Sequence, residues 1–137
     1  ISEPKCLSRP LYGFENTEHT INNEGPYAFY YHNKIYLAYS GGDARGYLYA
    51  IGMLTANDGD DLCDLSVWEK AKTPIASFAT IPGEYGPGHN SFFWDRDQNL
   101  WIAYHAVTSF EEKIVSSGMR RVYFEQDKTP RVDVIVE

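Results

Sequence analysis

The sequence has 137 residues, of which 43% are hydrophobic and 15% aromatic, and its formal net charge is −7. This length and composition are typical of one globular domain and exclude a disordered chain. The negative charge, with no cluster of Lys or Arg beyond Arg120-Arg121, argues against nucleic acid and anionic membrane surfaces as partners.

Further function classes are excluded by the apolar runs and the cysteines. The longest apolar stretches are only a few residues, far short of the roughly 20 that a membrane span needs. Cys6 and Cys63 lack metal-ligand spacing, and we expect two free thiols. Because residue 1 is isoleucine, a signal peptide or further structural repeats could precede it, so the sequence does not predict a localisation.

The first predicted unit covers residues 1–20, which contain no clear strand pattern. We interpret them as the end of a preceding sheet and its crossover, with residues 6–8 as the strand piece. The second unit covers residues 21–80. It contains an aromatic strand from Tyr27, a polar turn at 32–34, a second strand to Tyr39, a third from Tyr47 to Thr55 and a short fourth at 67–71.

The third predicted unit, residues 81–137, repeats this pattern after a Gly- and Pro-rich loop. A strand from Ser91, a turn at 95–99 and a second strand to His105 are followed by predicted strands at 119–125 and 131–136. The Ala-Tyr steps that end at Tyr39 and Tyr104 are 65 residues apart (104 − 39 = 65). The chain therefore contains an internal repeat and lacks a helix of normal length.

Four antiparallel strands per repeat predict an all-β fold made of β-propeller blades. Propellers close from typically 4–8 blades, so two repeats and part of a third cannot form a ring. A five-bladed ring of such repeats would need about 325 residues, roughly 190 more than are present. We expect the missing blades to come from a second chain or from a segment that precedes Ile1.

The start of the first strand in each blade faces the propeller axis, where ligands bind. A shift of 64 or 65 residues places Glu24 against Gly88 or His89. The repeat thus predicts that an acid and an imidazole occupy corresponding axial positions. Without the repeat, Glu24 would be interpreted as a solvated loop carboxylate or a cap next to Pro26.

Two motifs in order carry a resemblance to a known family. Glu24-Gly25-Pro26 precedes the first aromatic hairpin, and residues 88–92 (Gly-His-Asn-Ser-Phe) precede the second, with Gly118-Met119-Arg120 further on. Together they resemble the third- and fourth-blade signatures of family 43 glycoside hydrolases, over about residues 21–137. The resemblance implies a five-bladed propeller, of which this chain is the C-terminal portion.

The resemblance implies that Glu24 is the general acid of an inverting hydrolysis. The general base and an aspartate that tunes the acid are implied to lie on blades that precede this chain. The aspartates present here fit turn chemistry better: Asp95 and Asp97 lie in a hairpin turn, and residues 58–61 form a connecting loop. An acid without a base predicts that the chain alone is inactive.

The resemblance also implies roles for other site residues, and some of these residues have an alternative role. His89 is implied to lie under the sugar, where it could help hold a hydrated Ca²⁺ through water. Because calcium prefers oxygen ligands, the alternative is a buried histidine that is hydrogen-bonded to backbone and supports the floor of the pocket. Arg120 is implied to contact the sugar or the acidic centre. Glu84 and Tyr85 could form the rim of the sugar site, or an exposed acid and a packed ring.

These expectations define a function and its competitors. The first is a glycosidase, with no required cofactor, that acts on α-L-arabinofuranosides or β-D-xylosides of hemicellulose, with an oligo- or polysaccharide as substrate. The second is a non-catalytic carbohydrate-binding propeller. A protein-interaction propeller predicts a flat surface rather than converging polar groups, and the grouping of Glu24, His89 and Arg120 argues against it.

Overall fold

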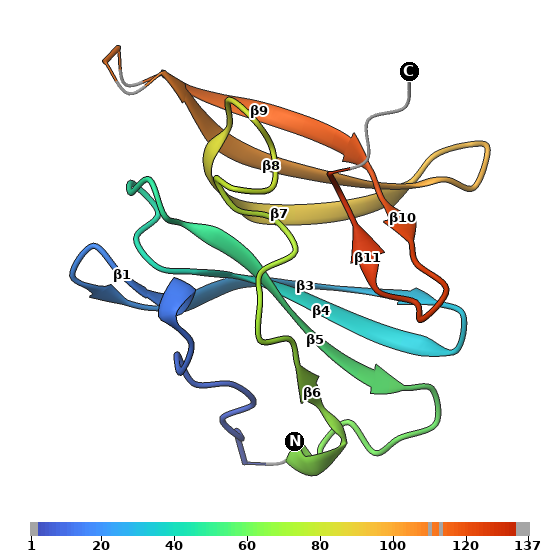
Figure 1. The fold of residues 1–137 in the computed structure, drawn as a ribbon. Coiled ribbons are helices and arrows are strands. Elements are labelled where there is room, and N and C mark those ends of the chain that lie inside the picture. The colour runs from blue at the N-terminus through green and yellow to red at the C-terminus, as the bar shows by residue number, and fades with distance from the viewer. Residues whose placement is uncertain (1–2, 110, 113, 134–137) are drawn as a thin grey trace.

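The structure is a computed structural model that describes residues 3–109, 111–112 and 114–133. Two main antiparallel sheets pack against each other, each formed by consecutive strands, with the N-terminal segment at the edge of the first (Figure 1). The part of the chain that is described contains helix only as two short 3-10 turns, η1 (Gly13–Glu15) and η2 (Leu65–Val67). In those residues no helix is long and apolar enough to cross a membrane. The predicted all-β class is confirmed.

The first sheet contains four strands in the order β3-β4-β5-β6, as predicted for residues 21–80. They are β3 (Asn23–Tyr31), β4 (Lys34–Gly41), β5 (Ala50–Asn57) and β6 (Glu69–Lys70). His32 and Asn33 join β3 to β4 with φ angles of 45° and 62°, the left-handed pair that a tight two-residue hairpin turn requires. The hairpin register follows from this turn.

The second sheet contains three strands in the order β7-β8-β9 among the described residues. They are β7 (Tyr85–Trp94), β8 (Leu100–Ser109) and β9 (Ile114–Arg121). We predicted the third strand at 119–125, and its start was wrong. Most side chains of β9 are exposed, so the strand carries little of the apolar alternation that sequence patterns detect.

The end of the chain also differs from the prediction. A separate hairpin, β10 (Tyr123–Phe124) with β11 (Pro130–Arg131), follows β9 instead of a continued third strand. The predicted fourth strand at 131–136 overlaps β11 only at Arg131, and residues 134–136 lie outside the described residues. The hairpin packs back on the first sheet, where the Tyr36 hydroxyl donates to the Lys128 carbonyl at 2.8 Å.

The N-terminal segment does not supply the strand piece that we placed at residues 6–8. These residues have no regular structure, and the strands of this segment are β1 (Asn16–Thr17) and β2 (Thr20–Ile21). Its anchor is the buried Glu15, which binds Lys70 of β6 and accepts hydrogen bonds from Tyr39 and Asn23. Cys6 and Cys63 are free and exposed, as expected.

Aromatic side chains join the two sheets. Phe29 of β3 lies 4.5 Å from Phe92 of β7 and 4.8 Å from Tyr36 of β4 between ring centroids. Around them, buried residues of both sheets form one core, which includes Ile51, Met53, Ile102 and Tyr104. Because β3 and β7 pack against each other through this core, their starts come to the same end of the molecule (Figure 1).

Candidate active site

Glu24 lies at the start of β3 and is half-buried. Its Oε1 accepts a hydrogen bond of 2.7 Å from the hydroxyl of Tyr49. The pairing with β4 shifts register just after Glu24, and Gly25 there has a φ of 56°, which favours glycine. This bulge turns Glu24 out of the regular ladder. Glu24 is also among the residues that line a hollow of about 170 Å³, together with mainly apolar residues.

Tyr49 is fully buried just before β5, with its ring against the backbone of the second sheet. A Cβ atom on Gly88 would lie 1.9 Å from Tyr49 Cε1, so only glycine fits opposite this ring. Burial raises the pKa of the Tyr49 hydroxyl, and the charge of Glu24 raises it further, although Ser40 acts in the opposite direction. Tyr49 therefore remains a hydrogen-bond donor to Glu24 at neutral pH.

His89 lies beside Glu24, across the boundary between the two sheets. Its backbone N–H donates to Ser40 Oγ at 2.7 Å, and Ser40 pairs with Glu24 across β3 and β4. A Cβ on Gly25 would lie 3.4 Å from His89 Nδ1. His89 has a φ of 50° at an irregular point of β7, and its side chain is exposed. The structure thus brings together Glu24 and His89.

His105, which we interpreted as structural, lies behind this pair. Its ring centroid is 5.8 Å from that of Tyr49 and 6.5 Å from that of His89. Burial and the neighbouring His89 lower the pKa of His105, whereas Glu24 acts to raise it. His105 Nδ1 is buried and has no hydrogen-bond partner among the described residues. A neutral imidazole therefore supports the Tyr49 ring.

Glu84 and Arg120 meet in a second polar group, which is centred on Tyr104. The Tyr104 hydroxyl donates to Glu84 Oε2 at 2.6 Å and accepts from Arg120 Nε at 2.9 Å, and Arg120 Nη2 donates to Glu84 Oε1 at 2.8 Å. Burial raises the pKa of the Tyr104 hydroxyl, and Glu84 adds to this. These contacts fix Arg120 to Glu84 and Tyr104. A contact between Arg120 and the sugar remains a prediction.

Tyr85 opens β7, and its ring packs against Tyr47, with 4.5 Å between centroids. Tyr47, Tyr49 and Ser40 were not predicted as site residues from the sequence. A signal for Tyr49 was present, because Gly88 is a glycine inside a strand, directly before His89, and such a glycine can mark a close approach of another group. The missing side chain at Gly88 is the space that Tyr49 fills.

The described residues offer little support for the prediction that His89 helps to hold a metal ion. Within the described ranges, no group of three or more His, Cys, Asp or Glu side chains could hold a metal ion. His89 offers one imidazole, whereas calcium takes six to eight oxygen ligands. The residues present therefore do not by themselves fit a calcium site, and a water-mediated role of His89 stays a prediction.

The aspartates lie where turn chemistry placed them. Asp95 accepts hydrogen bonds from the side chains of Asn99 and Trp101 and from backbone N–H groups in its turn. These bonds, with that of the Asn99 side chain first, lower the pKa of Asp95 to about 2. Asp58, Asp60 and Asp61 lie in the loop after β5. None of these four occupies the start of an inner strand.

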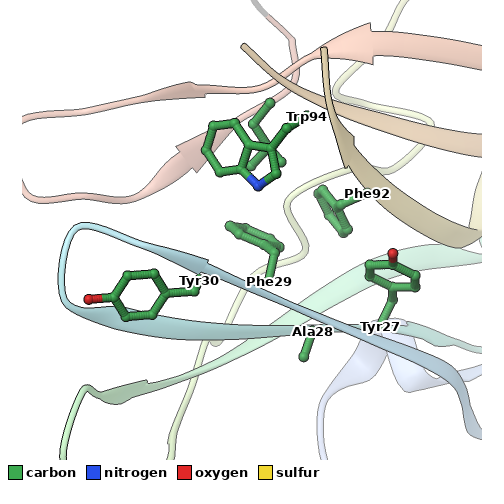
Figure 2. Close-up of a pocket in the computed structure, with 7 residues that line it drawn as sticks. Tyr27, Ala28, Phe29, Tyr30, Phe92 and Trp94 are labelled. Atoms are coloured by element: carbon green, nitrogen blue, oxygen red, sulfur yellow. The ribbon is translucent and has the colours of Figure 1, made fainter. Parts of the chain in front are cut away.

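A larger hollow, of about 460 Å³, lies further along β3 and β7 (Figure 2). It contains none of the predicted site residues, and its lining consists of Tyr27, Ala28, Phe29, Tyr30, Phe92, Trp94 and Leu100. Figure 2 shows Phe29 and Phe92 pointing toward each other at its centre. Because it offers no carboxylate or imidazole, we place the candidate active site at Glu24 and His89 instead.

Comparisons with known proteins point to one family. The model of glycosyl hydrolases family 43 matches residues 3–130. An extracellular exo-α-(1→5)-L-arabinofuranosidase of Streptomyces avermitilis is 29% identical over 97% of this chain and 29% of its own length. The protein of the same name from Streptomyces chartreusis is 38% identical over 73% of this chain and 30% of its own.

A comparison of the fold with solved structures also finds an arabinofuranosidase. The crystal structure of an α-L-arabinofuranosidase from Lactobacillus brevis matches with a TM-score of 0.83 and 28% identity, over 96% of this chain and 42% of that one. The chain therefore spans less than half of the length of these similar proteins.

Proposed function

The chain belongs to glycosyl hydrolases family 43, and on this basis we propose that it forms part of a glycosidase that releases α-L-arabinofuranosyl or β-D-xylosyl units from hemicellulose. The arabinofuranosidase names of the similar proteins favour the first of these sugars. The observation that carries the proposal is the hydrogen bond from Tyr49 to Glu24 at the start of an inner strand, next to His89.

Glu24 acts as the general acid in this proposal. Tyr49 donates to Oε1, so the proton resides on Oε2, from which it passes to the glycosidic oxygen as the bond to the sugar breaks. In an inverting reaction, a second carboxylate activates water on the opposite face of the sugar.

That second carboxylate belongs to the rest of the propeller. In inverting enzymes the two carboxyl groups are roughly 6.5–9.5 Å apart. The aspartates described above serve turns and loops, so we assign the base to the remaining blades, on a second chain or another segment of this protein. The complete propeller, meaning this chain with those blades, is therefore the active form, and this chain alone is inactive.

The proposal is tested by comparing the complete propeller with its Glu24→Gln variant on aryl arabinofuranosides and xylosides. General acid catalysis contributes about 10²- to 10⁴-fold, so the variant should lose at least about 100-fold in rate on substrates with poor leaving groups. Glu111→Gln, at an exposed position, is the matched control and should change nothing. Sugar binding without turnover in the wild-type protein would overturn the proposal in favour of a non-catalytic carbohydrate-binding propeller.

A further inference from the structure

We propose that Phe78, Tyr47 and Tyr85 form an aromatic platform that binds further sugar units of a neutral oligo- or polysaccharide, beyond the unit that is released. The inference rests on the proposed function. Tyr47 lies in the middle of the row, with its ring centroid 4.5 Å from that of Tyr85 and 5.3 Å from that of Phe78. The three residues come from two segments that are far apart in the sequence: Tyr47 from the loop after β4, and Phe78 and Tyr85 from the loop before β7 and the first residue of that strand.

The row begins directly beside the candidate active site. Tyr47 precedes Tyr49 by two residues, and Tyr85 precedes His89 by four. The two segments are joined, because the N–H of Gly86 donates to the Tyr47 carbonyl at 3.0 Å. In Figure 1 the loop after β4 and the start of β7 lie at the same end of the molecule. A sugar chain held at Glu24 can therefore continue over these rings.

The platform is held in place by the N-terminal hairpin. Glu18, at the turn between β1 and β2, accepts hydrogen bonds from the backbone N–H groups of Tyr47 at 3.0 Å and of Leu48 at 3.4 Å. A Cβ on Gly46 would lie 1.6 Å from Glu18 Oε2, so the loop fits closely around this carboxylate. Fixing the loop before binding reduces the entropy that a ligand must overcome.

The row ends at a hollow that could take a further unit. Phe78 is 42% exposed and borders this hollow, which has a volume of about 260 Å³. Its lining is almost entirely apolar, with Phe14, Leu48 and Pro74 among the residues beside Phe78. An apolar and aromatic lining is typical of small-molecule sites.

The chemistry of the row favours a neutral sugar chain as its occupant. Sugar rings present apolar C–H faces that pack on aromatic rings, whereas the net charge of −7 disfavours anionic ligands. Tyr47 follows β4, Tyr85 opens β7 and Phe78 lies in the loop before β7, so the row lies near the junction of the two sheets of this chain. The platform does not use the sheet faces against which the missing blades would pack.

The test compares chain-length dependence in the complete propeller. In Phe78→Ala, we expect kcat/KM to fall about 3- to 10-fold on arabino- or xylo-oligosaccharides, through a higher KM, and to stay unchanged on an aryl monoglycoside. Leu65→Ala is the matched control, because Leu65 is 44% exposed in the 3-10 turn η2, outside the row. An equal loss on both substrates, or no loss on either, overturns the platform.

The platform and the proposed function can fail separately. If Glu24→Gln abolishes turnover but Phe78→Ala has no effect on any chain length, the platform alone is wrong. If no glycoside is hydrolysed, the affinity for the same oligosaccharides, measured by calorimetry, still decides the question. Weaker binding by Phe78→Ala then supports the platform, and unchanged binding or no binding by the wild type overturns it.

Discussion

The hydroxyl of Tyr49 donates a 2.7 Å hydrogen bond to Oε1 of Glu24, although Glu24 lies in β3 and Tyr49 lies in the loop just before β5. The ring of Tyr49 is in turn fixed by the second sheet, between Gly88 and His105. The position of the proposed acid is therefore set by the packing of both sheets. A substitution at Tyr49 or Gly88 should therefore change the position of the Glu24 carboxyl, although the Glu24 side chain itself is unchanged.

Replacing Tyr49 with phenylalanine removes the hydroxyl and keeps the ring. Glu24 then loses the donor that orients Oε1, and we expect a loss of about tenfold in kcat on substrates whose leaving group needs protonation. Substrates with strongly acidic leaving groups should be affected much less. The measurement is the dependence of kcat on leaving-group pKa, in the complete propeller. An equal loss on all substrates would indicate a merely structural role for Tyr49.

Replacing Gly88 with alanine tests the close approach of the two sheets. The new Cβ would collide with the Tyr49 ring, so we expect the free energy of unfolding to fall by about 1–3 kcal/mol, as in other overpacked cores. Gly13→Ala is the control, because no atom lies within 4 Å of a Cβ at Gly13. Denaturant titration measures both variants. Equal stability of the two would contradict the packing described here.

Glu15 provides a stability prediction that is independent of catalysis. It is fully buried, pairs with Lys70, and accepts N–H groups of Leu11 and Tyr12 at 2.7 Å each. Glu15→Gln removes the charge that pairs with Lys70 and should lower the free energy of unfolding by about 3 kcal/mol. Glu3→Gln, at an exposed position, should change it by less than about 0.5 kcal/mol.

The Glu15 carboxylate also predicts how the stability of the fold changes at acid pH. Burial acts to raise the pKa of Glu15, but its hydrogen bonds, with that of Lys70 first, lower the pKa overall. Its contribution to stability is therefore present at neutral pH and is lost as the pH falls below about 4.5. If the stability of Glu15→Gln declined as steeply as that of the wild type in this range, the carboxylate would not be the cause.

The repeat made the hairpins and the pairing of axial positions predictable from sequence. Strong aromatic alternation marks β3, β4, β7 and β8, and polar turns separate them, so their order followed directly. Equivalent tyrosines of the repeat even behave alike: Tyr39 donates to Glu15 and Tyr104 to Glu84. The spacing also predicted that Glu24 and His89 lie near each other, as the contacts of Gly25 and Ser40 with His89 show.

Contacts between the sheets could not be predicted in this way. The pairing of Tyr49 with Gly88 joins residues 39 apart (88 − 49 = 39) and depends on how closely two sheets approach. The start of β9 was missed because its side chains are mostly exposed and carry no clear alternation. The contacts of Arg120 depend on Glu84, which lies in a loop whose path no local pattern determines.

His105 should make stability depend on pH near neutrality. Burial lowers its pKa, so the unfolded chain binds a proton below about pH 6.5 that the folded chain does not. The contribution is fully present above that pH and is lost as the pH falls toward the lowered value. Denaturant titrations between pH 7.5 and 5 should show a smaller loss for His105→Phe than for the wild type. Identical slopes would contradict the assignment.

The role of Glu24 as the proton donor is tested most directly by leaving-group dependence in its glutamine variant. Glutamine keeps the shape of the side chain but cannot deliver a proton. In the complete propeller, Glu24→Gln should lose at least about 100-fold in kcat on an alkyl or oligosaccharide glycoside, and retain most of its rate on a dinitrophenyl glycoside, which departs without protonation. Equal losses on the two substrates, or full activity on both, would contradict Glu24 as the general acid.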